Sequence, residues 1–99
     1  MRAAAIDRFG PPAALTLHTL PVPQPGRNEI LLAVHAAGVG VWDASIRDGS
    51  WRPYGRAKLP LFLGTDGAGI VVARGAGARK LRVGDRAYAY DYANPKGSF

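Results

Sequence analysis

The chain has 99 residues, a formal net charge of +6 and no cysteine. A chain of about this length forms one domain with one modest core, too small for a nucleotide-binding fold beside a substrate domain. The missing thiols exclude disulfides, iron–sulfur clusters and cysteine-ligated zinc. No apolar run approaches the roughly 18 residues of a membrane span, and Asp7 interrupts the start too early for a signal peptide. We therefore expect a cytoplasmic domain with no membrane partner.

The N-terminal part predicts three strands, over Arg2–Asp7, Leu15–Thr19 and Glu29–Ala37, with turns rich in proline and glycine between them. Prolines at every second position from Pro21 to Pro25 remove ladder donors, which predicts an extended edge that ends in a turn. Apolar residues occupy both faces of Glu29–Ala37. This pattern predicts a strand in the middle of the fold.

The spacing of apolar residues changes from a strand pattern to a helix pattern after the third predicted strand. From Trp42 to Gly49, apolar and small residues recur at i, i+3, i+4 and i+7, which predicts a helix over Val41–Asp48. Asp43 stands in the first turn of this helix, four residues before Arg47. We expect Asp43 to cap the helix and to pair with Arg47.

The C-terminal half returns to short strands. We expect a buried strand over Ile70–Arg74, a turn over Gly75–Lys80 and a last strand that starts at Arg86. Alternate residues of this last strand, as far as Tyr92, share one face. Many short strands with a single helix predict a mainly β fold of the barrel or sandwich type.

Three patterns suggest chemistry but favour ordinary structural roles. Gly75–Lys80 follows a strand, yet a lysine replaces the third glycine of a dinucleotide fingerprint and no helix follows, so we interpret it as a β-turn. His18 and His35 lie on separate predicted strands with no carboxylate at ligand spacing, so no metal site is expected. Asp66 and Asp85 are interpreted as turn residues that bond local backbone amides.

Three motifs resemble, in order and spacing, the N-terminal domain of the medium-chain dehydrogenases/reductases. They are Glu29–Asp43, Pro60–Val71 and Val83–Arg86, and the resemblance covers essentially the whole chain. Two shorter stretches, Ile46–Gly49 and Gly64–Asp66, are similar to the branch of zinc-independent quinone oxidoreductases, also called zeta-crystallin-like.

This resemblance implies a GroES-like, partly open β-barrel over residues 1–99, with one short helix near residues 41–48. It also implies a Rossmann domain later in the same polypeptide, which binds NADPH in the cleft between the two domains and through which a homodimer could form. No nucleotide-binding motif lies within residues 1–99. We therefore expect this stretch to be a piece of a larger oxidoreductase that is inactive alone.

The chain departs from the family at the positions that bind zinc. Zinc-dependent relatives carry Cys-Gly-Thr/Ser-Asp where this chain has Gly40, Val41, Trp42 and Asp43, so the metal-binding thiol and the hydroxyl that relays the proton are both missing. The zinc-binding histidine of those relatives corresponds to Thr65. The quinone reductase branch usually has asparagine at the position of Gly40. The resemblance therefore implies a cofactor, NADPH, and no zinc.

The implied activity is reduction of quinones or α,β-unsaturated carbonyls by hydride transfer. Such acceptors spread the added charge over a conjugated system, whereas an isolated ketone would need a Lewis acid. Gly40 and Val41 are expected to allow close approach of the cofactor. Trp42 is expected to pack over the substrate or the nicotinamide, and Tyr54 to line the entrance. No catalytic residue is assigned.

Two alternatives of other classes are weighed against this function. Trp51–Lys58 interleaves aromatic and basic residues, as surfaces for single-stranded nucleic acid do. Pro53 and Gly55 break any strand there, so a loop anchored by Trp51 and Tyr54 is favoured and nucleic acid is not expected. A co-chaperonin ring subunit would need a mobile loop, for which Gly10–Ala14 is short and stiffened by proline.

Overall fold

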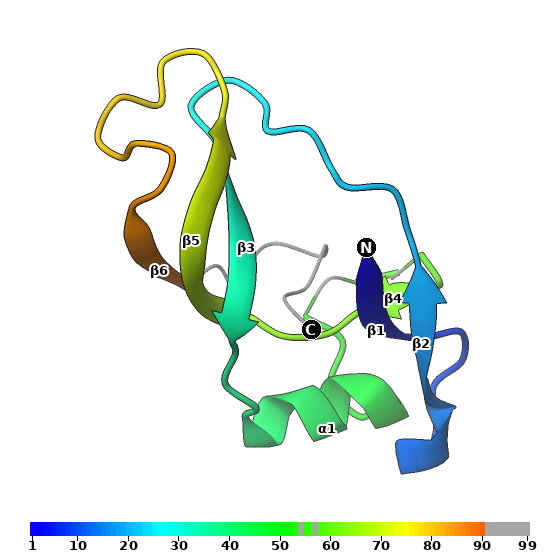
Figure 1. Ribbon diagram of the computed structural model, residues 1–99. Helices are drawn as coiled ribbons and strands as arrows, with labels where there is room; N and C mark the ends of the chain where they lie inside the picture. Colours follow the sequence, from blue (N-terminus) through cyan, green and yellow to red (C-terminus); the bar gives the residue numbers. More distant parts are fainter. Residues whose placement is uncertain (54, 57, 91–99) are drawn as a thin grey trace.

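The computed structural model describes residues 1–53, 55–56 and 58–90, which form two three-stranded sheets and an α-helix (Figure 1). The strands are β1 (Arg2–Ile6), β2 (Leu15–Thr19), β3 (Ile30–Ala36), β4 (Leu61–Phe62), β5 (Asp66–Arg74) and β6 (Arg86–Tyr90). The helices are the 3-10 helix η1 (Pro12–Ala14) and the α-helix α1 (Val41–Asp48). One sheet has the order β2-β1-β4 and the other β3-β5-β6, and neighbouring strands are antiparallel.

The first sheet packs against α1 and contains the hydrophobic core. β1 is its central strand, and Ala5 and Ile6 on it are fully buried. The core cluster consists of Ile6, Ala14, Ile46, Leu61 and Leu63, with Phe9 packed against it. Burial of these side chains joins the sheet, η1, α1 and the segment after β4 into one packed unit.

The second sheet is held mainly by backbone pairing. β5 lies between β3 and β6, and the register of β3 with β5 shifts at two places. A Cβ atom on Gly69 would lie 1.9 Å from the carbonyl oxygen of Ala33, so only glycine allows the two strands to approach this closely. Val71 is the one buried hydrophobic residue among the strands of this sheet. This sheet therefore has almost no core of its own within the described residues.

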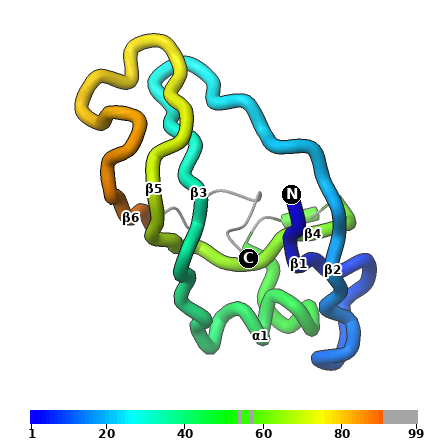
Figure 2. The backbone as a smooth tube through the Cα atoms, in the orientation of Figure 1, coloured from blue at the N-terminus to red at the C-terminus, as the bar shows by residue number. Residues whose placement is uncertain are grey.

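The connection from β2 to β3 crosses from the first sheet to the second and passes beside the β5–β6 connection (Figure 2). The amide of Gly75 donates to the carbonyl of Glu29, and the amide of Asn28 donates to the carbonyl of Ala76, both at 2.8 Å. Ala78 donates to the carbonyl of Gly75 at 3.3 Å, which confirms the turn predicted there. No helix in the described part of the chain is long and apolar enough to cross a membrane.

Most predicted elements are confirmed. The helix over Val41–Asp48 and the strand over Leu15–Thr19 have the predicted bounds. The strand predicted over Ile70–Arg74 begins earlier, at Asp66, because its first residues pair with β6, Asp66 with Tyr90 and Gly67 with Ala89. The mainly β fold with one short helix is confirmed, and the two sheets stay open and do not close into a barrel within the residues described.

The predicted central position of β3 is wrong for the described part of the chain. β3 pairs with β5 alone and has no fully buried residue, whereas β5 is the central strand. Apolar residues on both faces of a strand therefore did not indicate a central place in the sheet. The last strand ends at Tyr90, and the predicted position of Tyr92 lies outside the described residues.

Candidate functional site

The predicted cofactor residues Gly40, Val41 and Trp42 lie at the N-terminus of α1. Gly40 is the N-cap, with extended backbone angles, and its amide donates to Oδ2 of Asp43 at 2.8 Å. The Asp43 side chain is 4% exposed, and its second oxygen, Oδ1, accepts from the amide of Gly64 at 3.3 Å. The capping role predicted for Asp43 is confirmed. The same carboxylate also attaches the start of α1 to the loop after β4.

The predicted pair between Asp43 and Arg47 is wrong. Arg47 donates from Nε to the carbonyl of Gly10 at 3.1 Å, and the amide of Gly10 donates back to the carbonyl of Arg47 at 3.0 Å. No ion pair joins Asp43 to Arg47 among the described residues. Spacing by four residues places the two charges on one side of the helix. The buried carboxylate of Asp43, however, accepts hydrogen bonds from two backbone amides instead.

Asp66 extends the attachment from the other side. Its Oδ1 accepts from the amide of Gly38 at 2.6 Å, across 28 residues of sequence. A Cβ atom on Gly38 would lie 2.8 Å from Oδ2 of Asp66, so the carboxylate lies directly against this glycine. The prediction of a local turn bond is therefore wrong for Asp66. It is confirmed for Asp85, whose Oδ2 accepts from the amide of Arg82 at 2.8 Å.

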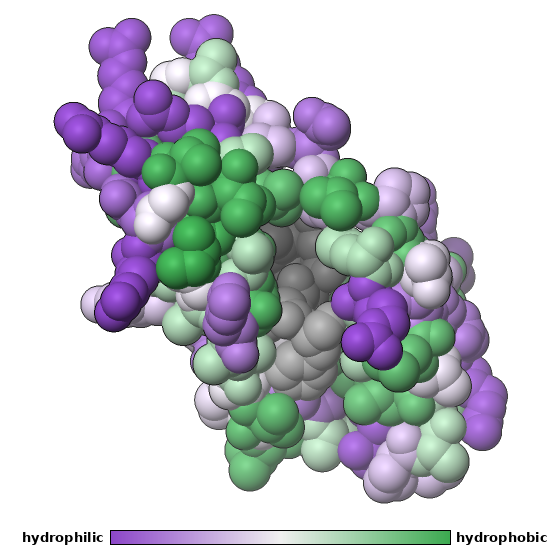
Figure 3. Space-filling model, in the orientation of Figure 1, coloured by the Kyte–Doolittle hydropathy of each residue, from purple (hydrophilic) through white to green (hydrophobic). Residues whose placement is uncertain are grey.

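Trp42 forms an aromatic surface on the first turn of α1. Its side chain is 41% exposed and stands beside the more exposed Val39 and Val41. In Figure 3, apolar surface covers the start of α1. A Cβ atom on Gly40 would lie 2.2 Å from Cε2 of Trp42, so the indole covers Gly40. Any side chain at residue 40 would therefore collide with the indole in this position. The role of Gly40 in close approach of the cofactor stays a prediction.

The residues at the family's zinc positions do not fit a zinc ion. Gly40 has no side chain, and Thr65 offers a hydroxyl in place of an imidazole. In the part of the chain that the structure describes, no three His, Cys, Asp or Glu side chains lie close enough to hold a metal. Thr65 is 9% exposed, and its hydroxyl has no hydrogen-bond partner within that part. The site therefore presents an aromatic ring and a buried hydroxyl where a metal centre would need ligands.

Both histidines lie in strands, as predicted. His18 on β2 has Nε2 3.2 Å from Oδ2 of Asp7 and 3.3 Å from Oγ1 of Thr16. Both partners contact the same ring nitrogen, so the three groups cannot form a hydrogen-bonded relay through the imidazole. The ring also meets Phe62 edge to face, with centroids 6.2 Å apart. His18 therefore has an ordinary role in joining β2 to its neighbours.

The predicted entrance residue Tyr54 lies outside the described residues. Nearby, Arg52 places its guanidinium 4.4 Å from the centre of the Phe9 ring and donates from Nε to the carbonyl of Gly49 at 3.3 Å. The amide of Trp51 bonds to the carbonyl of Ser45. Arg52 and Trp51 thus fasten the end of α1 and do not extend a row of stacking groups.

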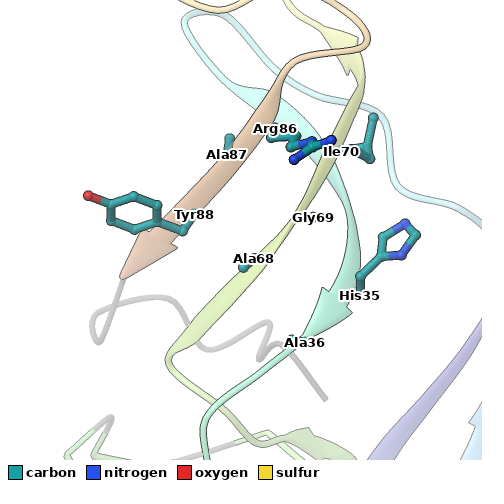
Figure 4. Close-up of a pocket in the computed structure, with 8 residues that line it drawn as sticks. All are labelled: His35, Ala36, Ala68, Gly69, Ile70, Arg86, Ala87 and Tyr88. Carbon is teal, nitrogen blue, oxygen red and sulfur yellow. The ribbon is translucent and has the colours of Figure 1, made fainter.

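The structure also contains an open groove that sequence reasoning missed. It has a volume of ≈ 410 Å³ and lies on the β3–β5–β6 sheet (Figure 4). The lining residues are His35, Ala36, Ala68, Gly69, Ile70, Arg86, Ala87 and Tyr88. Pairing of β5 with both neighbours brings His35 and Tyr88 to one sheet from distant parts of the sequence, which no local pattern could indicate.

Comparisons with known proteins identify the family. Residues 26–98 match the family model for the alcohol dehydrogenase GroES-like domain. Among curated relatives, alcohol dehydrogenase of Schizosaccharomyces pombe is 39% identical over 85% of this chain, and rat quinone oxidoreductase is 35% identical over 91%. The structure of Escherichia coli quinone oxidoreductase complexed with NADPH superimposes on 94% of the chain with a TM-score of 0.85 and 31% identity.

The chain spans about a quarter of the length of these relatives: 23% and 27% of the two curated proteins and 28% of the solved structure. The agreement extends over nearly all of this chain, in sequence and in fold. The chain therefore belongs to the alcohol dehydrogenase GroES-like domain family, the N-terminal domain of the medium-chain dehydrogenases/reductases.

Proposed function

We propose that this domain forms one wall of the active site of an NADPH-dependent oxidoreductase that reduces quinones or α,β-unsaturated carbonyls without zinc. The observation that carries the proposal is the exposed indole of Trp42, which covers Gly40 where a zinc site would need a ligand. A conjugated acceptor delocalises the charge that arrives with a hydride. It therefore needs less Lewis-acid stabilisation than an isolated ketone does.

The proposed enzyme also needs a cofactor domain, which we place after these residues in the polypeptide. A Rossmann domain later in the same polypeptide holds NADPH, and NADPH when bound supplies the hydride. Relatives of this kind support the assignment: the similar quinone oxidoreductase of Escherichia coli was solved with NADPH. We place the enzyme in the cytoplasm, as a homodimer formed through the cofactor domain.

In this proposal the residues of this chain bind the acceptor and orient it against the nicotinamide. Trp42 offers a flat apolar face on which a quinone ring or the nicotinamide stacks. Gly40 and Val41 form the backbone beside it, and Tyr54 lines the entrance. The hydroxyl of Thr65 is buried and unpartnered within the described residues, and it is a hydrogen-bond donor of the kind that an acceptor oxygen needs.

The relatives do not favour the two alternatives of other classes. A co-chaperonin ring subunit and a barrel that binds single-stranded nucleic acid both fit a small basic β domain. The relatives reported above, however, are named as dehydrogenases or oxidoreductases. Arg52, at the start of the aromatic and basic stretch, is also already stacked on Phe9.

The test uses the full polypeptide with its cofactor domain and follows NADPH oxidation by 1,4-benzoquinone. Trp42→Ala should lower kcat/KM by about tenfold, because it removes one aromatic contact with the flat acceptor. Trp42→Phe should retain most of the activity, since it keeps a ring. Trp51→Ala is the matched control: Trp51 is similarly exposed, at 50%, but lies beyond the end of α1, and activity should not change.

Two outcomes would contradict the proposal. Activity that a chelator removes and zinc restores would refute the zinc-free chemistry. Equal kcat/KM for Trp42→Ala and the unmodified enzyme would refute the aromatic wall.

A further inference from the structure

We propose that Asp66 is a positioning residue for Trp42, which it controls through Gly38 without touching the indole. Asp66 and Asp43 together accept hydrogen bonds from the amides of Gly38, Gly40 and Gly64, and we call these two carboxylates the carboxylate clamp. The proposal rests on the proposed function, because positioning of Trp42 matters to the reaction only if Trp42 lines the acceptor site.

The clamp takes over where strand pairing ends. The last pair between β3 and β5 joins Ala36 to Ala68, two residues before Gly38. Asp66, the first residue of β5, then reaches past this pair with its side chain and binds the amide of Gly38 at 2.6 Å. This distance lies just below the usual range of about 2.7–3.2 Å for N–H···O hydrogen bonds, and a charged acceptor shortens such bonds. The exit of β3 is thereby fixed to the start of β5.

The segment that the clamp holds would otherwise be loosely defined. Gly38 and Gly40 flank Val39, and glycine permits more backbone conformations than any other residue. The side chain of Val39 is 79% exposed, so burial does not anchor it. The amides of Gly38 and Gly40 each bond to a carboxylate of the clamp. The path of this segment therefore depends on the two side chains.

The position of Trp42 follows from the path of this segment. The indole covers Gly40, which the Asp43 end of the clamp holds, while the Asp66 end holds Gly38 two residues earlier. Release of Gly38 lets the segment before the helix move against the ring. Because Asp43 is buried and also caps α1, its removal would disturb folding as well. Asp66 is only partly buried and offers the cleaner test.

The experiment uses this 99-residue chain with Trp51→Phe, which leaves Trp42 as the only tryptophan of the two. The readouts are acrylamide quenching of Trp42 fluorescence, quenching by 1,4-benzoquinone, and the thermal midpoint by circular dichroism. Asp66→Ala should raise the acrylamide quenching constant about twofold, because a released segment uncovers the indole face. Asp66→Asn, which keeps one acceptor oxygen, should give an intermediate value.

The matched control is Asp85→Ala. It removes the same kind of bond, a carboxylate that accepts from a backbone amide at 2.8 Å, but within a local turn next to β6. This variant should lower the thermal midpoint by a similar amount and leave the quenching of Trp42 unchanged. Equal quenching in Asp66→Ala and Asp85→Ala would overturn the proposal.

A second variant keeps the test decisive if Asp66→Ala fails to fold. Gly38→Ala leaves the carboxylate in place but puts a Cβ atom 2.8 Å from its oxygen, so it opens the clamp from the other side. It should reproduce the change in Trp42 quenching, and its effect should not add to that of Asp66→Asn, because both break one contact. Unchanged quenching in a folded Gly38→Ala variant would also overturn the proposal.

The outcomes separate this proposal from the proposed function. If Asp66→Ala alters Trp42 while Trp42→Ala leaves the activity of the full enzyme unchanged, the clamp stands and the acceptor site lies elsewhere. If Trp42→Ala lowers activity while Asp66→Ala leaves Trp42 unaffected, the proposed function stands and Asp66 is not a positioning residue.

Discussion

The two sheets of this domain are stabilised in different ways. The sheet β2-β1-β4 packs with α1 around five buried hydrophobic side chains, whereas the sheet β3-β5-β6 has Val71 as its one buried hydrophobic residue. The second sheet relies on its backbone ladder and on glycines that let strands approach closely. Within one fold, side-chain burial stabilises the sheet β2-β1-β4, whereas backbone hydrogen bonding stabilises the sheet β3-β5-β6.

The candidate site lies where these regions meet. α1 belongs to the packed region through Ile46, while its N-terminus is attached to the second sheet through Asp66 and Gly38. A site at this junction has a helix packed on the hydrophobic core on one side and a sheet with almost no core on the other. Trp42 lies on the helix of the packed side, and in our proposal its placement depends on the bond between Gly38 and Asp66 of the second sheet.

The largest effect should come from the packed region. Ile6 is fully buried in the core cluster, and Ile6→Ala should lower the free energy of unfolding by about 2–5 kcal/mol. Val72→Ala on the second sheet is the contrasting variant: Val72 is 47% exposed, and its loss should cost less than about 1 kcal/mol. Urea unfolding of both variants measures the difference, and equal losses would refute the contrast between the two sheets.

An intermediate effect should come from backbone geometry in the second sheet. Gly69→Ala places a Cβ atom against the carbonyl of Ala33 and should destabilise the domain by about 1–3 kcal/mol through strain between β3 and β5. In the same strand, a Cβ atom on Gly67 would meet the side chain of Val34 at 3.3 Å and the carbonyl oxygen of Ala36 at 3.9 Å, so Gly67→Ala should cost less. Hydrogen exchange of the β3 amides reports the loss. Equal protection in both variants would show that the close approach is not important.

The smallest effect concerns pH. The pKa of Asp48 is lowered from its ordinary value by hydrogen bonds from the side chain and the amide of Ser50 and, more weakly, by the charge of Arg47. A lowered pKa contributes stability above the ordinary pKa, and this contribution is lost as the pH falls through the lower value. Ser50→Ala should move the pKa of Asp48 back toward 3.8 and weaken this acid dependence.

Titration of the Asp48 carboxyl by nuclear magnetic resonance, with unfolding followed from pH 7 to pH 2, checks this prediction. Since Asp48 is fully exposed, the change should be small against that of Ile6→Ala. An unchanged pKa in Ser50→Ala would contradict it.

Local patterns in the sequence predicted much of the fold. The helical spacing from Trp42 onward set the bounds of α1, and alternation in Leu15–Thr19 set those of β2. The capping role of Asp43 also followed from its place in the first turn. These features depend on residues within about four positions of one another, where the geometry of helix and strand fixes which side chains share a face.

Contacts between distant segments could not be predicted in this way. Asp66 was expected to bond nearby amides, but it binds Gly38, 28 residues earlier, because the pairing of β3 with β5 brings their ends together. For the same reason Asp43 bonds Gly64, and His35 comes to share a groove with Tyr88. The sequence around an aspartate does not indicate which distant backbone amide its carboxylate will bind.

The sequence by itself determined the family, the mainly β fold, the helix that carries the site and the residues at the family's zinc positions. Only the tertiary structure decided how Trp42 lies over Gly40 and which carboxylates bind the backbone amides of that segment. The physical reason is that helix and strand propensities depend on residues close in the sequence. Hydrogen bonds to the carboxylates of Asp43 and Asp66 depend instead on which distant segments folding brings within about 3 Å of one another.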